Sequence, residues 1–269
     1  MSHEATKITP VQVWSSGKIV TSKDSLVNEA AVEIIIEIKG EQKKLGILLR
    51  TPGEDVELVT GWLLGEAIIQ SHSSILEMES SPERIVVTMD SSNFDLSDFN
   101  ERKFPITSSC GLCGRETLDG LIIPSLLTIS DERWISPEVL TQLPKRLTDS
   151  QDHFKTTGGL HACALFDIEG NLISVREDVG RHNALDKLIG SRLIANSLPA
   201  EKQILMLSGR IGYELIQKAA LAGIPAIAGL GAPSTMAVDA AREGGLTLIG
   251  FLRSNRFNVH TGAWRLIEE

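Results

Sequence analysis

Short blocks of apolar residues separated by polar turns run along most of this chain, and the blocks predict a mixed α/β protein. Residues 31–37 (AVEIIIE) and 44–50 (KLGILLR) are rich in branched apolar side chains, which favours two β-strands joined by a turn at KGEQ. In residues 54–69 the apolar side chains are spaced as on one helical face. A further strand is predicted for RIVVTM, which completes a small α+β unit.

From about residue 135, short apolar strands alternate with helices. Ser136 and Pro137 predict a helix start, because serine caps free N–H groups and proline suits the first turn. The predicted strands are GLHACALFD, LISVRED, QILMLS, PAIAG and LTLIGFL, and the later helices are RHNALDKLIGSRLIA, YELIQKAALA and STMAVDAARE. Such alternation is typical of a mostly parallel sheet covered by helices, so we predict a three-layer α/β fold.

Residues 90–109 separate these two regions; they are polar and lack periodic apolar positions, which predicts a loop or linker. We therefore divide the chain into three parts. The predicted parts are an N-terminal α+β region at 1–104, a mobile loop bearing C-x-x-C at 105–125 and an α/β domain at 126–269.

The charge and cysteine content restrict the function classes. The 269 residues carry a formal net charge of −9, which argues against a general binder of nucleic acid or membrane surfaces. No apolar run is long enough to span a bilayer, and the start MSHEATKITP lacks the order of a secretory signal. We expect a cytoplasmic protein whose three cysteines are thiols.

Two of these cysteines, Cys110 and Cys113, stand in the stretch TSSCGLCGRE at residues 107–116. Each is followed by glycine, and Arg115 and Lys103 lie nearby in the sequence; cations favour the reactive thiolate. The residues alone leave four interpretations open: half of a zinc site, a redox disulfide, a sulfur relay, or no chemistry at all.

The other two zinc ligands could come from His161 and Cys163, which share one face of a predicted strand. A free cysteine is more often a small buried apolar residue, and we favour that interpretation for Cys163. A functional role and a hydrogen-bonded structural role are equally compatible with His161.

Three predicted strands of the second half end in similar residues, and open α/β sheets bind ligands beyond such ends. Serine, glycine and arginine at strand–helix junctions suit a phosphorylated ligand, because helix N-termini and guanidinium groups both attract phosphate. None of the three stretches matches a P-loop or a dinucleotide fingerprint. The candidate residues are Ser208, Gly209 and Arg210 after the first strand, Gly229, Gly231, Ser234 and Thr235 after the second, and Phe251, Leu252, Arg253, Ser254, Asn255 and Arg256 after the third.

A fourth polar stretch, VREDVGRHNALDKLIG, lies at a strand-to-helix junction. Asp178 or Asn183 is a possible helix cap there. Asn183, Asp186 and Lys187 fall on adjacent helical positions, which is compatible with a polar cleft wall. His182 is a candidate acid or base if it faces a cleft.

Five stretches in this order, SSCGLCG, TGGLHACALFD, REDVGRHNALDKLIG, SGRIGYELIQKAALAGIP and FLRSNRFNVHTG, closely resemble the FdhD family. The resemblance runs from roughly residue 30 to the C-terminus. It implies a sulfurtransferase that accepts persulfide sulfur from a cysteine desulfurase. That sulfur is passed to the molybdenum cofactor in its bis(molybdopterin guanine dinucleotide) form, which formate dehydrogenase needs for activity.

The resemblance also implies residue roles, a fold and an assembly. Cys110 would carry the persulfide with Cys113 as its partner, and Phe251 through Arg256 would bind the cofactor, of which guanine nucleotides are fragments. A fold similar to cytidine deaminases and a homodimer are implied as well. The deaminase zinc signature is not matched, since no glutamate follows the histidine of HAC. Two rival functions remain, a dithiol–disulfide oxidoreductase and a zinc-stabilised module that binds a nucleotide cofactor.

Overall fold

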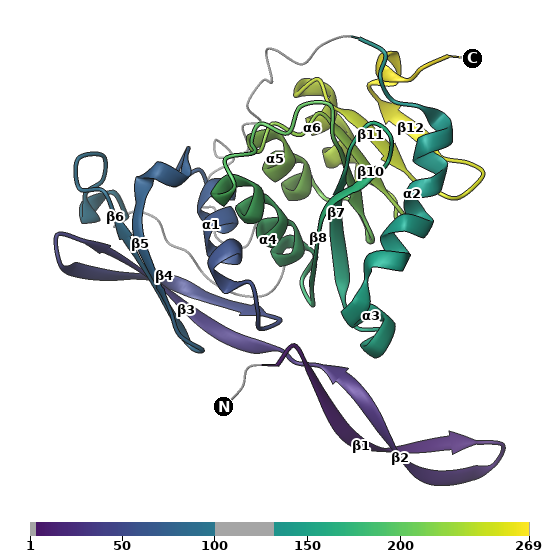
Figure 1. Ribbon diagram of the computed structural model, residues 1–269, viewed down its shortest axis with the longest axis horizontal. Helices are drawn as coiled ribbons and strands as arrows, with labels where there is room; N and C mark the ends of the chain where they lie inside the picture. The colour runs from purple at the N-terminus through teal and green to yellow at the C-terminus, as the bar shows by residue number, and fades with distance from the viewer. Residues whose placement is uncertain (1–3, 100–131, 269) are drawn as a thin grey trace.

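The computed structural model describes residues 4–99 and 132–268, which form a projecting arm, a four-stranded unit and a six-stranded unit (Figure 1). The arm consists of β1 (Thr6–Ser15) and β2 (Lys18–Val27). The four-stranded unit consists of β3 (Ala30–Ile38), β4 (Glu41–Arg50), α1 (Asp55–Gly65), β5 (Ile75–Ser80) and β6 (Arg84–Met89), with short 3₁₀ helices at His72–Ser74 and Leu96–Phe99.

The six-stranded unit takes up the rest of the described chain. Its elements are α2 (Pro137–Ser150), α3 (Asp152–Thr157), β7 (His161–Phe166), β8 (Leu172–Asp178), α4 (Arg181–Ile194), β9 (Ile204–Leu207), α5 (Tyr213–Leu221), β10 (Ala226–Gly229), α6 (Thr235–Glu243), β11 (Thr247–Gly250), β12 (Asn258–Thr261) and a 3₁₀ turn at Ala263–Arg265. Among all these helices, none is long and apolar enough to cross a membrane.

The smaller sheet has the order β4-β3-β6-β5, in which β3 pairs antiparallel with β4 and parallel with β6. The strands, turn and helix predicted for residues 31–69 are confirmed. Alternate residues of β3 are fully buried, as a sheet with one face on the core requires, and α1 covers that face. The strand β5 was not predicted, because its ILEMES sequence is mostly exposed at the sheet edge.

The larger sheet has the order β12-β11-β10-β9-β7-β8, and its prediction as mostly parallel is wrong. Only β9, β10 and β11 pair in parallel, whereas the other three pairings are antiparallel. The physical reason is the length of the connections. Asp167 accepts hydrogen bonds from the backbone N–H groups of Glu169 and Asn171 in a tight β7–β8 turn, and such a turn joins only antiparallel strands.

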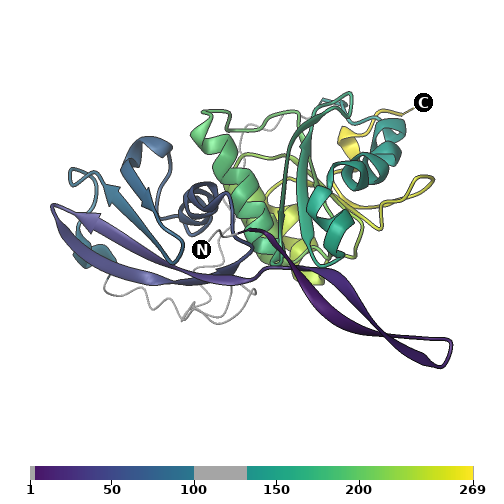
Figure 2. The same ribbon diagram turned by 60° about the horizontal axis from the view of Figure 1, so that its bottom comes forward.

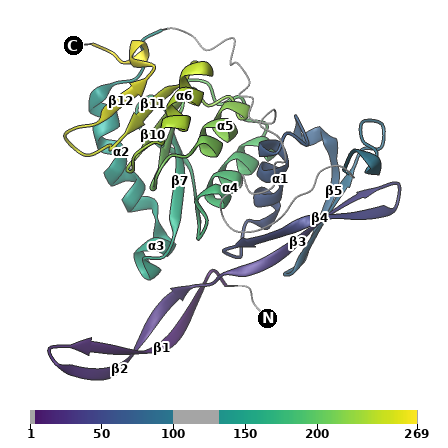
Figure 3. The ribbon, with the colours of Figure 1, turned by 180° about the vertical axis from the view of Figure 1, so that it is seen from behind.

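Side chains alternate between the two faces of the larger sheet and give the predicted three layers. One face packs with α2, through residues such as Phe166 and Leu140. The opposite face, with Leu165 and Leu205, packs against α4, α5 and α6 in a core that also contains the four-stranded unit. The two units thus share one hydrophobic core, with α1 and α4 at its centre (Figures 2 and 3).

Two glycines let α1 and α4 cross in direct backbone contact. A Cβ atom on Gly61 would lie 1.9 Å from the carbonyl oxygen of Asp186, and one on Gly190 would lie 1.9 Å from that of Glu57. No side chain tolerates such distances, so any larger residue forces the helices apart. The glycines therefore set the spacing between the two units.

We predict that Gly190→Ala destabilises the protein by about 3 kcal/mol, the upper end for overpacking. Helix propensity alone acts the other way, since alanine stabilises a helix by roughly 1 kcal/mol relative to glycine. Guanidinium unfolding measures the net effect. Gly212→Ala is the control, because a Cβ there meets no atom within 4 Å; equal stability of the two variants contradicts the prediction.

Candidate functional site

Four strands of the larger sheet end at one edge, and three helices begin there. The strands β9, β10 and β11 are parallel, and β8 runs in the same direction because it pairs antiparallel with β7, which pairs antiparallel with β9. The helices α4, α5 and α6 follow β8, β9 and β10 directly. Their N-termini therefore direct partial positive charge to this edge.

The N-cap residue of α6 makes a side-chain hydrogen bond to the helix, whereas the N-cap residues of α4 and α5 do not. The hydroxyl of Ser234 accepts a 3.1 Å hydrogen bond from the N–H of Ala237 at the start of α6, as predicted. Gly180 and Gly212, the N-cap residues of α4 and α5, have no side chain to do this. Side-chain capping thus leaves the first N–H groups of α4 and α5 to other acceptors.

The loops after the three parallel strands touch one another, as predicted from the sequence. The N–H of Gly231 donates to the carbonyl of Gly209 at 3.2 Å, and that of Phe251 donates to the carbonyl of Gly231 at 3.1 Å. A Cβ on Gly231 would lie 2.6 Å from the carbonyl oxygen of Gly209. Glycine is therefore required for this contact, which brings the first and third candidate stretches together.

Most of the predicted binding residues are exposed at this edge. Arg210, Ser254, Asn255 and Arg256 are exposed, and so is Phe251, whose φ of 53° turns the chain after β11. These residues combine guanidinium groups, polar groups and an aromatic ring on one loop cluster. Such a combination suits a ligand with phosphate groups and a heterocyclic base.

Three other predicted residues have structural contacts. Leu252 is fully buried. The hydroxyl of Ser208 accepts a 2.9 Å hydrogen bond from the N–H of Ala162, next to the end of the β7–β9 ladder. One nitrogen of the exposed Arg253 guanidinium donates to the carbonyls of Leu230 and Leu252, both at 2.8 Å. Leu252 and the Ser208 hydroxyl thus shape the loops, while Arg253 also presents charge.

Two further residues belong to this edge, although the sequence did not place them there. His161 begins β7 opposite the end of β9, and its Nδ1 would lie 3.3 Å from a Cβ on Gly209. Burial, followed by the nearby charge of Arg181, lowers the pKa of His161 below its ordinary value, against the opposing influence of Asp178. The Nε of Arg181 is buried and has no hydrogen-bond partner within the described part of the chain.

Cys163 is a core residue, which confirms the favoured interpretation. It is almost fully buried, and its Sγ lies 3.8 Å from the carbonyl oxygen of Arg181. Burial, followed by the charges of Asp186 and Asp178, raises the pKa of the thiol far above its ordinary value. Cys163 is therefore not a nucleophile in the folded protein.

The predicted catalytic residues, Cys110 and Cys113, lie outside the described residues, so their roles remain predictions. Within residues 4–99 and 132–268, no group of three or more histidine, cysteine or acidic side chains has the arrangement of a metal site. The zinc interpretation needs Cys110 and Cys113, and it is not tested by the described part.

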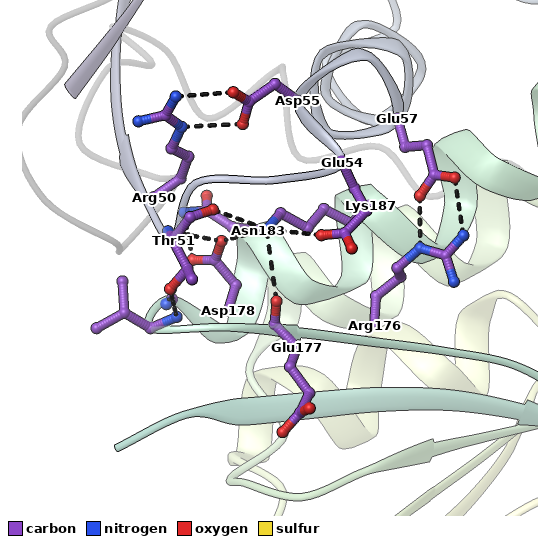
Figure 4. Close-up of polar contacts among 12 residues, drawn as sticks. Arg50, Thr51, Glu54, Asp55, Glu57, Arg176, Glu177, Asp178, Asn183 and Lys187 are labelled. Carbon is purple, nitrogen blue, oxygen red and sulfur yellow. Dashed lines mark hydrogen bonds and ion pairs between the residues drawn. The ribbon is translucent and has the colours of Figure 1, made fainter. Parts of the chain in front are cut away.

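Behind the edge, a buried network ties the β8–α4 turn to the end of β4 (Figure 4). Asp178 accepts hydrogen bonds from the N–H groups of Thr51 and Gly180 and from the amide of Asn183, at 2.9 to 3.0 Å. Lys187 lies 3.0 Å from the same carboxylate and 2.9 Å from the carbonyl of Thr51. Asp178 and Lys187 are fully buried, so the cleft wall suggested for this helix face is wrong.

A second set of buried pairs joins α4 to α5. His182 lies 2.8 Å from Glu214, and Lys218 donates to both carboxylate oxygens of Asp186 at 2.6 and 2.7 Å. Burial raises the pKa of Asp186 to about 6, against the opposing influence of the Lys218 charge. The His182–Glu214 pair joins the first turns of the two helices at this edge, whereas Lys218 belongs to the last turn of α5 and holds the two helices together further from it.

A sequence profile of the FdhD/NarQ family matches residues 28–267, and the chain belongs to this family. It is 43% identical over 265 residues to the sulfur carrier protein FdhD of Streptomyces avermitilis, covering 93% of this chain and 92% of the relative. It is 44% identical over 237 residues to the protein of the same name from Sulfolobus acidocaldarius, covering 88% and 90% of the two chains.

The fold is also that of a solved relative. A crystal structure from Desulfotalea psychrophila, named as a formate dehydrogenase accessory protein, superposes with a TM-score of 0.78. It covers 98% of this chain and the whole of the other at 23% sequence identity. At that identity the likeness concerns the fold alone, which the family resemblance had already implied; the finer similarity to cytidine deaminases stays a prediction.

We predict that the Asp186–Lys218 pair behaves as a coupled unit. Asp186→Asn or Lys218→Met alone leaves a buried charge without its partner and should cost about 3–5 kcal/mol. The double variant, with no unpaired charge, should lose far less than the sum of the two. Guanidinium unfolding of the four proteins provides the measurement, and strictly additive losses would show that the pair is not coupled.

Proposed function

We propose that this protein is a sulfur carrier that transfers persulfide sulfur to the molybdenum cofactor required by formate dehydrogenase. The supporting observation is the family match over nearly the whole chain, together with relatives more than 40% identical that carry the name sulfur carrier protein FdhD. The C-x-x-C stretch SSCGLCG supplies the thiols that such a role needs. The finer steps below rest on this proposal.

In the first step, the thiolate of Cys110 attacks the outer sulfur of a persulfide on a cysteine desulfurase. A new sulfur–sulfur bond forms at Cys110, and the desulfurase cysteine leaves as a thiolate, so no external oxidant or reductant is needed. Cys113 is the partner thiol. The only cysteine in the described part, Cys163, is unsuited to this attack because it is a buried, protonated thiol.

In the second step, the thiolate of Cys113 attacks the inner sulfur of the Cys110 persulfide, which forms a Cys110–Cys113 disulfide and releases the outer sulfur as hydrosulfide. This sulfur passes to the bis(molybdopterin guanine dinucleotide) cofactor, which is the substrate of the carrier, and a cellular thiol reduces the disulfide. The edge formed by Ser208–Arg210 and Phe251–Arg256 suits this substrate. Its exposed arginines, and the partial positive charge at the N-termini of α4 and α5, attract a pyrophosphate. Phe251 offers an exposed ring on which guanine can stack.

The proposal includes the partners and the setting expected from the sequence. The carrier meets a cysteine desulfurase and formate dehydrogenase in the cytoplasm, without binding nucleic acid or membranes. It acts as a homodimer. The overall acidic charge agrees with the absence of nucleic-acid binding.

We predict a persulfide on Cys110 after incubation with a cysteine desulfurase and free cysteine. Intact-protein mass spectrometry should show a gain of one sulfur atom that is lost on reduction. Cys110→Ala should abolish it, whereas the control Cys163→Ala should retain it because that thiol is buried. An adduct that survives Cys110→Ala and disappears in Cys113→Ala reverses the assignment, and no adduct in the parent protein refutes the carrier role.

We predict that GDP, a fragment of the substrate, binds weakly but in preference to ADP. Guanine offers its N1–H and the adjacent 2-amino group to the predicted acceptors, which are Asn255, Asp239 or a backbone carbonyl. Adenine has no N1–H and carries its amino group at another position, so it leaves those acceptors unpaired. Arg256→Ala should weaken GDP binding about tenfold, the effect of one charge-assisted hydrogen bond.

Isothermal titration calorimetry measures both effects. The matched control is Arg84→Ala, an exposed arginine on the four-stranded unit, which should leave GDP affinity unchanged. Equal affinity for GDP and ADP, or an unchanged GDP affinity in Arg256→Ala, would contradict the prediction that the guanine nucleotide binds at these strand ends.

A further inference from the structure

The arm formed by β1 and β2 is a regular hairpin that extends away from the body (Figures 1 and 2). Ten residue pairs connect its strands, from Thr6 with Val27 to Ser15 with Lys18. Near its base the arm contacts α3, and a Cβ on Gly159 would lie 3.2 Å from Val27. A two-stranded hairpin has little stability of its own in water, so most of this arm lacks the packing that normally sustains one.

Both faces of the arm carry exposed apolar side chains. Cross-strand partners share a face, and successive pairs alternate between faces. Trp14 and Ile19 are paired on one face with exposures of 70% and 65%, and Val13 and Val20 are paired on the other face and are also exposed. Ile8 adds to the Trp14 face. Exposed apolar side chains gathered in this way mark a binding surface.

The charge of the arm is opposite to that of its neighbouring unit. The arm has three exposed lysines, Lys7, Lys18 and Lys23, against one acidic residue, Asp24. Residues 28–99, by contrast, contain fourteen acidic and only five basic residues. That acidic unit also exposes apolar side chains on its edge strand β4, Ile47 and Leu49. An apolar, basic arm and an apolar, acidic unit are complementary.

The arm and the acidic unit of the same chain do not meet. They point in opposite directions from the junction between β2 and β3 (Figures 1 and 3). Contact between two arms is disfavoured because it brings their lysines together. Two copies of the chain could bring these complementary pieces into contact, which one copy alone does not.

We propose that the arm docks on the acidic four-stranded unit of a second copy of this chain, and that the exchange is reciprocal. A two-fold axis makes each copy donate one arm and receive one, which closes the assembly as a dimer. The apolar faces supply the affinity, while the lysines supply orientation and association rate.

Light scattering on the purified full-length protein tests this proposal. The parent chain should have twice its monomer mass of 29.2 kDa at micromolar concentration. The double variant Trp14→Lys with Ile19→Lys should be a monomer, because it places two charges in the apolar contact. Leu172→Lys, an equally drastic change at an exposed apolar position of β8, is the matched control and should stay dimeric.

A second variant preserves the apolar pairs of the arm and changes only its charge. Replacing Lys7, Lys18 and Lys23 by glutamate should weaken the dimer by about tenfold or more, since each arm then repels the acidic unit. A monomeric parent protein overturns the proposal, as does a dimer unaffected by both arm variants. Binding of the monomeric parent to phosphatidylcholine vesicles, lost in the Trp14 and Ile19 variant, assigns the arm to a lipid surface instead.

The outcome is separable from that of the proposed sulfur transfer. The arm variants leave Cys110 and the strand-end residues unchanged, so the sulfur adduct serves as an independent readout. A monomeric variant that still takes up sulfur supports the arm contact and the carrier role together. A dimeric parent that takes up no sulfur supports the arm contact and refutes the carrier role.

Discussion

The crossing of α1 and α4 is the constraint on which the rest of the structure depends. With glycine at 61 and 190 the two helix backbones touch, and the four-stranded unit joins the core of the larger sheet. That closeness brings the end of β4 within hydrogen-bonding reach of Asp178 and Lys187. These buried charges then fix where α4 begins, and with it the position of Arg181 and His182. The close helix contact at Gly61 and Gly190 thus determines where Arg181 and His182 lie at the edge of the larger sheet.

Much of the fold was predictable from local pattern, because local sequence sets helices, caps and strands. Ser136 and Ser234 are helix caps as predicted, and the βα order of the second half appears as drawn from the sequence. Strand direction was less accessible, since it depends on connection lengths and on which strands become neighbours. The arm was missed for another reason. Its residues are apolar on both faces, so neither the alternation nor a buried run that signals a strand is present.

Some parts of the candidate site were also predictable from the sequence, and others required the structure. Gly209, Gly231 and Phe251 each follow a parallel strand, so their meeting at one edge follows from the order of the units. His161 belongs to a strand that runs the other way, and its place beside Gly209 needed the sheet order. Two of the buried contacts of α4 could not be predicted, because Lys218, the partner of Asp186, lies 32 residues along the chain and Thr51, which accepts from Lys187, lies in the other unit. Sequence alone cannot distinguish such a partnered charge from a solvated one.

The shared core also has a consequence for the energetics of opening. Because α1, α4 and the inner faces of both sheets belong to one cluster of buried residues, neither unit has a complete core without the other. The two units therefore form one cooperative folding unit, and amide hydrogens of α1 and α4 should exchange with solvent only when the whole molecule opens. The arm has no share in that cluster. The protection of the arm amides against exchange therefore depends on whether a partner is bound to the arm. Hydrogen exchange thus measures two separate quantities: the global stability of the two units from α1 and α4, and partner binding from the arm.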